Sequence, residues 1–206
     1  WVVHIAEPNQ QGLSNNSYTS FHVNSNGLIL NNMPIATSVT AVTDLSAEIV
    51  SNPNLTTSAG VILNQVTGTT GSIFNGFLEV AGHSADLIIA NPYGIACNDC
   101  GVINADRVDL VVGSATINNG AIGNYTTASA AGDLRILGQG LDLSRATVSG
   151  VFAPEITVDA SFNTHILYAG IGSGDFSRLA GTGLSAGNYY NRSSTSSLGT
   201  NTSALL

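Results

Sequence analysis

The two cysteines of the chain lie close together, at Cys97 and Cys100. A Cys-x-x-Cys pair can form a disulfide, bind a metal ion or exchange electrons with other thiols. A turn at 98–99 can bring the two Cβ atoms within bonding reach, so we expect a disulfide, with two reduced, half-buried thiols as the alternative. A thioredoxin-like role would need the pair at the start of a helix in an α/β context, which is absent here. Zinc needs four ligands, and none of the histidines is near in the sequence: His4, His22, His83 and His165.

The charged side chains do not form a recognisable catalytic pattern. The acids are scattered, and the tightest charged group is Asp106, Arg107 and Asp109. We expect Asp106 and Arg107 to form an exposed ion pair of little energetic value. No Ser-His-Asp order or glycine-rich phosphate loop is present. We therefore expect neither an enzyme nor a bound cofactor.

The composition excludes several classes of partner. Only 9% of the residues are charged, lysine is absent, and the net charge is −8. So few basic residues cannot neutralise a run of phosphates, which argues against nucleic-acid binding, and an anionic membrane would repel the chain. No apolar run approaches the length of a membrane span. The basic residues are Arg107, Arg135, Arg145, Arg178 and Arg192.

The surface must be covered largely by Asn, Ser, Thr and Gly, which is typical of exported bacterial β-proteins. A close cysteine pair fits an oxidising compartment. Residues 1–4 carry neither a basic region nor a long apolar core, so we expect that a signal peptide was removed upstream.

A strand and a tight turn precede the cysteines. Residues 87–90 form a short apolar run that predicts one buried strand. Asn91 can bond to its own backbone, Pro92 fixes φ near −65°, and Gly94 can adopt a positive φ. The segment therefore predicts a strand followed by a sharp corner.

A repeat begins near residue 72. Similar apolar segments begin at Asp86, Asp109, Asp133 and Glu155, about 23 residues apart, with shorter strand candidates and Gly, Asn or Ser turns between them. This pattern predicts a coiled solenoid, in which each coil is a triangle of short parallel strands with alternate apolar side chains inside. A β-sandwich is the alternative, but it does not account for the repeat.

The ends of the chain are less regular. We expect a strand at 2–6, a turn near 8–12 and a cap over about 1–35, with solenoid coils over about 36–170. Segments 44–50 and 58–66 are the most plausible places for partial helix, although their β-branched residues argue for strand or loop. We expect about 171–206 to be an extended strip or a loose tail, within a single domain of 1–206.

Residues 91–95, Asn-Pro-Tyr-Gly-Ile, resemble the Asn-Pro-Asn-Gly-Ile signature of the two-partner secretion (TPS) domain. This family stands at the N-terminus of large exported proteins such as filamentous hemagglutinin, hemolysins and contact-dependent growth inhibition effectors. A second family signature, Asn-Pro-Asn-Leu, is intact at 52–55. Only Tyr93 departs from the pattern, at a position where a type I turn tolerates most residues. The Cys-x-x-Cys resembles the hemolysin and growth-inhibition branch, and the specific likeness covers about 3–113.

The resemblance implies an all-β fold: a right-handed parallel β-helix with an N-terminal cap and extra-helical β-hairpins. It also implies a secretion signal and folding template, recognised by the periplasmic POTRA domains of an outer-membrane β-barrel transporter. The protein would be monomeric, and secreted or on the cell surface of a Gram-negative bacterium after passing through the periplasm. The motif residues are Asn52, Pro53, Asn54, Leu55, Asn91, Pro92, Tyr93, Gly94 and Ile95, and the disulfide expected from the turn at 98–99 joins Cys97 and Cys100.

Two questions stay open at this level. The Asn-Pro turns either serve folding alone or also shape a surface that the transporter reads. The alternative function is a surface adhesin that binds host glycan or protein, for which aromatic side chains would line an exposed groove. The activity of any downstream region lies outside this sequence.

Overall fold

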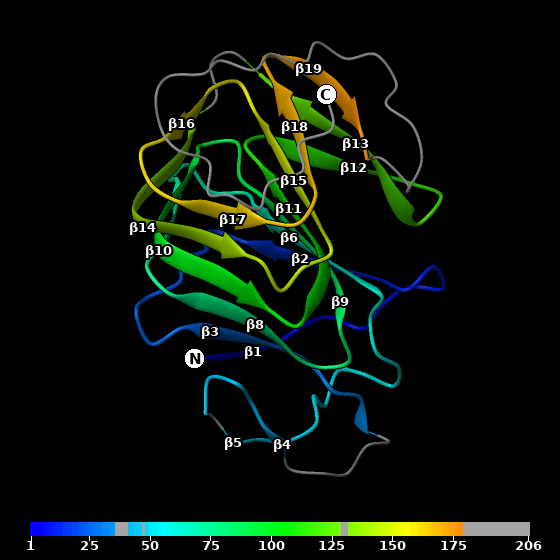
Figure 1. Cartoon of the computed structure of the whole chain (residues 1–206). Coiled ribbons are helices and arrows are strands. Elements are labelled where there is room, and N and C mark those ends of the chain that lie inside the picture. Colours follow the sequence, from blue (N-terminus) through cyan, green and yellow to red (C-terminus); the bar gives the residue numbers. More distant parts are fainter. Residues whose placement is uncertain (36–40, 47, 129–131, 179–206) are drawn as a thin grey trace.

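The computed structural model describes residues 1–35, 41–46, 48–128 and 132–178. Over these ranges the chain is built of short strands without an α-helix, and most of the strands pair in parallel (Figure 1). No helix in the described ranges is long and apolar enough to cross a membrane. Successive turns of the chain place parallel strands on three faces, so the architecture is a parallel β-helix.

The first and second faces belong to one sheet of eight strands. Two of its strands, β10 and β14, are long enough to serve both faces, and the register of β10 shifts between Asn98 and Cys100. The first face contains β7 (Ser72–Phe74), the start of β10 (Ile95–Ile103), the start of β14 (Leu134–Leu143) and β16 (Ile156–Val158). The second face contains β1 (Val2–His4), β3 (Leu28–Asn32), β8 (Phe77–Gly82), the ends of β10 and β14, and β17 (Phe162–Thr164).

The third face is a separate six-stranded parallel sheet. Its order is β2, β6, β9, β11, β15 and β18, so neighbouring strands come from successive turns of the chain. Its strands are β2 (Leu13–Tyr18), β6 (Val61–Val66), β9 (Ala85–Ala90), β11 (Ala105–Val111), β15 (Val148–Ala153) and β18 (Leu167–Ile171).

Alternate side chains of each strand fill the interior of the coils. On the third face, Ile62 lies opposite Leu87, and Leu87 lies opposite Val108 in the next coil. All three side chains are fully buried in one continuous core. Burying a side chain of this size contributes about 1.5–3 kcal/mol relative to leaving it exposed, so the stacked interior supplies most of the driving force.

Two short antiparallel sheets cover the outer sides of the β-helix. On the third face lies a sheet of β12 (Ser114–Asn118), β13 (Ala121–Thr127) and β19 (Gly174–Ser177), which we call the outer sheet. Beside the second face lie β4 (Ala41–Val42) and β5 (Glu48–Ile49). The carboxylate of Glu79 holds this second segment by accepting the N–H groups of Asp44 and Leu45, each at 2.9 Å.

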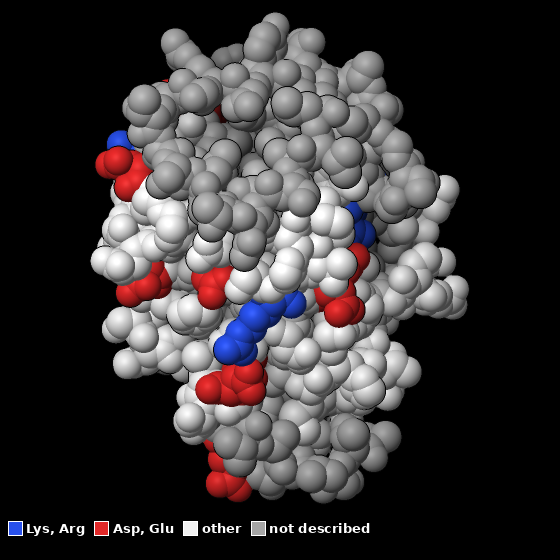
Figure 2. Space-filling model, in the orientation of Figure 1, with Lys and Arg blue, Asp and Glu red and all other residues white. Residues whose placement is uncertain are grey.

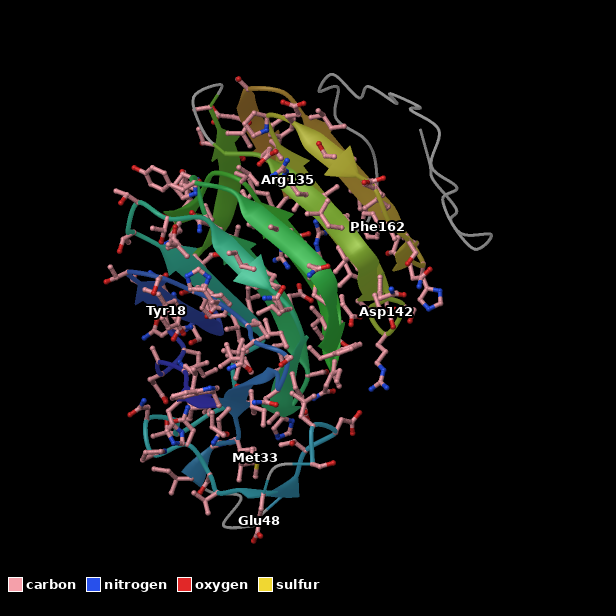
Figure 3. All side chains as sticks on the ribbon, turned by 90° about the vertical axis from the view of Figure 1, so that its left-hand side faces the viewer. Tyr18, Met33, Glu48, Arg135, Asp142 and Phe162 are labelled. Atoms are coloured by element: carbon pink, nitrogen blue, oxygen red, sulfur yellow. A yellow bond between two sulfur atoms is a disulfide. The ribbon has the colours of Figure 1, made fainter. Side chains whose placement is uncertain are left out.

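The first face carries no such cover within the described ranges. Figure 3 looks onto the side of the stack and shows Met33 and Glu48 at one end, with Arg135 and Phe162 toward the other. Figure 2 shows a visible face that is mostly neutral, with small charged patches in which basic and acidic side chains touch, as the 9% charged composition predicts.

The prediction of partial helix at 44–50 and 58–66 is wrong. The first segment is a turn followed by β5, and the second contains β6. Backbone pairing explains β6: it bonds to β2 on one side and to β9 on the other, so its β-branched residues sit in the middle of a sheet.

The solenoid prediction is confirmed, but the repeat does not stack as one column. Asp133 and Glu155 precede strands that pair in register, with Leu134 opposite Ile156. Asp86 and Asp109 lie on adjacent strands two positions out of step, because Asp109 is opposite Ile88. Asp109 and Asp133 lie on different faces, since β12 and β13 are inserted between them.

The predicted boundaries of the cap and the tail stay predictions. Within the expected cap, β1, β2 and β3 pair in parallel with neighbouring strands of the stack. Of the expected strip at 171–206, residues 179–206 lie outside the described residues.

Candidate functional site

The Asn-Pro-Tyr-Gly turn joins the third face to the first face. The Asn91 side chain is fully buried, and its Nδ2 donates to the Thr70 carbonyl at 3.0 Å and to Ser72 Oγ at 2.9 Å. Its Oδ1 accepts the N–H of Tyr93 at 2.8 Å, which forms an Asx turn. Gly94 closes the corner with a φ of 107°, a conformation that favours glycine. One buried amide therefore fixes this corner to the preceding coil.

The same turn also receives the following coil. The N–H of Asn91 donates to the Val111 carbonyl at 2.9 Å, and the N–H of Gly132 donates to the Pro92 carbonyl at 2.9 Å. A Cβ on Gly132 would lie 2.4 Å from the backbone of Tyr93, so the close approach requires glycine. The corner is thus a joint between three successive coils.

The Asn-Pro-Asn-Leu turn has the same design. Asn52 is fully buried, and its Nδ2 donates to the carbonyls of Ile5 at 3.0 Å and Asn31 at 2.9 Å. Its Oδ1 accepts the N–H of Asn54 at 2.9 Å. The N–H of Leu55 donates to the Asn52 carbonyl at 3.1 Å, and the Leu55 side chain enters the main core.

Both motifs therefore combine a buried anchor with an exposed tip. The first Asn of each lies inside and bonds to an earlier coil, and Leu55 and Ile95 bury the apolar end of each motif. Pro53, Asn54 and Tyr93 are exposed, with Tyr93 at 49%. The anchors explain a folding role, while the tips are the parts that another protein can touch.

Cys97 and Cys100 are joined by a disulfide at the corner between the first and second faces, with their Cα atoms 5.6 Å apart. Between them Asp99 has a φ of 62°, and the register of β10 shifts. Both sulfurs belong to the buried core, and Cys97 Sγ lies 3.2 Å from the Gly140 carbonyl of the next coil. The bond fixes this corner. Because it closes a short loop, it lowers the entropy of the unfolded chain only slightly.

The expected surface pair of Asp106 and Arg107 is wrong. Asp106 is exposed and accepts a hydrogen bond from Ser84 Oγ at 3.1 Å. Arg107 is buried, and its Nε lies 2.9 Å from each carboxylate oxygen of Asp109. Residues two apart on a strand share one side, so the Arg-x-Asp spacing within an apolar strand was the available signal.

Tyr125 completes the environment of Asp109. Its hydroxyl donates to Asp109 Oδ2 at 2.6 Å, and its ring is fully buried against Phe152. Burial raises the pKa of Tyr125 far above its usual value, and the negative charge and hydrogen bond of Asp109 raise it further. The phenol therefore stays protonated and serves as a donor.

The described ranges hold no group of three or more His, Cys, Asp or Glu side chains placed to bind a metal ion. The geometry defines an all-β solenoid whose distinguishing features are structural corners. It places the chain in the class of parallel β-helix domains.

The comparisons with known proteins identify the family. The chain matches the TPS secretion domain over residues 1–204, well beyond the 3–113 in which the sequence motifs lie. The solved secretion domain of filamentous hemagglutinin superposes with a TM-score of 0.76 at 31% identity, covering 91% of this chain and 66% of that one. The chain belongs to the TPS secretion domain family, whose function is that of a secretion signal and folding template.

Relatives lie in the branch that the cysteine motif indicated. A tRNA nuclease CdiA of Yersinia mollaretii is 38% identical over 174 residues, and a hemolysin of Serratia marcescens is 39% identical over 156 residues. These matches cover 84% and 75% of this chain but only 6% and 9% of the relatives. The chain therefore corresponds to a small part of much longer exported proteins.

Proposed function

We propose that this domain is a non-catalytic export signal, read in the periplasm by the POTRA domains of a cognate outer-membrane β-barrel transporter. It acts as a monomer and leads a longer protein to the outside, or to the surface, of a Gram-negative cell. The observation that carries this proposal is the shared design of the two Asn-Pro turns, with a buried anchor and an exposed tip in each.

The contact with the transporter is made while the chain is partly extended, when each Asn-Pro turn has closed locally through its Asn Oδ1 but the coils have not yet stacked. A strand of such a chain presents unpaired backbone groups that can add to the edge of a partner's sheet. Few charges and a single short-range cross-link suit this mode, because neither resists extension. Once the chain is released, each coil provides the edge on which the next one pairs.

The adhesin alternative requires several exposed aromatic side chains, and within the described ranges only Trp1 and Tyr93 are exposed. Tyr125 is fully buried, and Tyr18 packs against Phe21 with ring centroids 5.1 Å apart. Tyr189 and Tyr190 lie outside the described residues.

The test separates the tips from the anchors. The chain is produced behind a periplasmic export signal, with and without a cognate transporter, and the secreted fraction is measured beside the refolding yield of the purified chain. We expect Asn91→Ala to lower both quantities, because it breaks the corner. We expect Tyr93→Ala to lower secretion while refolding stays normal, with Asn163→Ala on the exposed side of β17 as the matched control.

Two results would contradict the proposal. Equal release with and without the transporter would show that the domain is not a partner-dependent signal. Normal secretion of Tyr93→Ala, together with normal secretion of a variant altered at Pro53 and Asn54, would show that the tips are not contacts.

A further inference from the structure

A group of charges, buried at Asp109 and partly exposed at Asp86 and Arg178, fastens the outer sheet to the third face of the β-helix. We call this group the latch; its members are Asp86, Arg107, Asp109, Tyr125 and Arg178. Asp109 Oδ2 accepts hydrogen bonds from Tyr125 at 2.6 Å and from Arg178 Nε at 3.2 Å, in addition to the contacts with Arg107. The guanidinium of Arg178 also bonds to Asp86. Two carboxylates face two guanidiniums, so the latch is neutral as a whole.

The latch lies in an apolar setting. Leu63, Ile88, Val111 and Phe152, on the outer side of the third face, form one buried cluster with Tyr125. Gly150 makes room for the carboxylate, because a Cβ there would lie 2.2 Å from Asp109 Oδ1. Burying a carboxylate in such surroundings destabilises the fold unless all of its partners are in place. Removing one partner therefore weakens the attachment of the whole latch.

The members of the latch come from distant parts of the chain. Asp86 and Asp109 lie on β9 and β11, Tyr125 lies on β13, and Arg178 directly follows β19. Arg178 is 92 positions from Asp86, so the coils from β9 to β18 separate the two in sequence.

The outer sheet is held by side chains rather than by the backbone ladders of the β-helix. Its strands pair with one another, with β13 between β12 and β19, and form a sheet separate from those of the three faces. The coils can therefore stack before it docks. Until it docks, the apolar outer side of the third face is uncovered.

We propose that the latch makes docking of the outer sheet a distinct last step of folding, completed by Arg178 after the coils have stacked. Docking covers the apolar outer side of the third face and satisfies Asp109. If the proposed function is also correct, the latch closes only when residues 86–109 and 178 are on the same side of the membrane, so it marks the end of transit for this domain.

The test uses hydrogen exchange in the purified 206-residue chain without any transporter. Arg178→Met keeps much of the apolar stem and removes the charge, and Tyr125→Phe removes only the hydroxyl. The control is Arg135→Met, which removes an arginine of the first face whose ion pair with Asp133 is half exposed.

For Arg178→Met we expect amides of β12, β13 and β19 to exchange about 10- to 100-fold faster, the range expected for losing a hydrogen bond to a charged group. Amides of β6, β9 and β11 should keep their protection. Tyr125→Phe should show the same pattern with a smaller amplitude, and Arg135→Met should leave the outer sheet unchanged.

Two outcomes would overturn the proposal. Faster exchange spread equally over the coils and the outer sheet would show that the latch belongs to one cooperative unit. Unchanged exchange of the outer sheet in both latch variants would show that the latch does not hold it. Either outcome leaves the proposed export function standing, because secretion is not measured.

Discussion

Replacing Asn91 by alanine tests the idea that a buried amide sets the corners of this β-helix. The substitution leaves three groups without their partner: the Thr70 carbonyl, Ser72 Oγ and the N–H of Tyr93. The Ser72 bond is buried and the other two are partly buried. At about 1 kcal/mol for each partly buried group and about 2 kcal/mol for the buried one, the free energy of unfolding should fall by about 3–5 kcal/mol.

That loss is a large share of the whole stability of a domain, which is about 5–15 kcal/mol. The assay is equilibrium unfolding of the purified chain in urea, followed by circular dichroism. With a slope of about 2–3 kcal/mol per molar urea, the midpoint should fall by about 1–2.5 M. Asn163→Ala, an exposed Asn to Ala change on β17, should shift it little.

A double-mutant cycle sharpens the assignment. Ser72→Ala alone removes one of the three partners, and the combined variant with Asn91→Ala should lose less than the sum of the two single variants. If Asn91→Ala unfolds at the same urea midpoint and slope as Asn163→Ala, the buried amide does not set the corner and the reasoning is refuted.

The remaining predictions concern the disulfide, the Asn-Pro-Tyr-Gly turn and the dependence of stability on pH. Replacing Cys97 and Cys100 by serine should lower the free energy of unfolding by at most about 1–3 kcal/mol, measured in urea, because the closed loop is short; an equal midpoint would show that the bond is not a stabiliser. Gly132→Ala should destabilise by about 1–3 kcal/mol, since its Cβ would meet backbone at 2.4 Å, whereas Gly60→Ala meets nothing within 4 Å. Burial raises the pKa of Tyr18 to about 12, because the folded state favours the neutral phenol. The stability that this preference adds to the folded state is fully present below the unfolded pKa near 10, and it is lost as the pH rises from 10 toward 12. Absorbance titration of the phenolates and urea midpoints at pH 9 and 11 check this, and Tyr18→Phe should weaken the decline.

The parts of the fold that follow from short-range patterns could be predicted from the sequence. The apolar run before Asn91 and the Pro and Gly of the turn specify a strand and a corner, and both are present. The spacing of similar segments indicated a solenoid because each coil buries the same kind of side chain. Both Asn-Pro turns were recognised as motifs, although the sequence could not reveal that their amides reach back to earlier coils.

The parts that depend on distant pairing could not be predicted. β2 has the polar sequence Leu-Ser-Asn-Asn-Ser-Tyr and carries no strand signal. It becomes a strand because it pairs with β6, and because Ser14 and Asn16 bond inward to Ala6. The insertion of β12 and β13 breaks the spacing of the repeat, and the partner of Asp109 at position 178 lies far away in sequence.

The cysteine corner has a topological consequence. Because its cross-link joins residues only three positions apart, the oxidised chain is still a single unbranched thread. When the unfolded chain is extended from its ends, every segment becomes straight except the small ring closed by the disulfide. No second segment of the chain is held beside the first. A disulfide between different coils would instead close a long loop, so that two segments of the chain would have to lie side by side when it is extended. If the domain is exported as proposed, the disulfide can therefore form before or after the chain passes through the transporter.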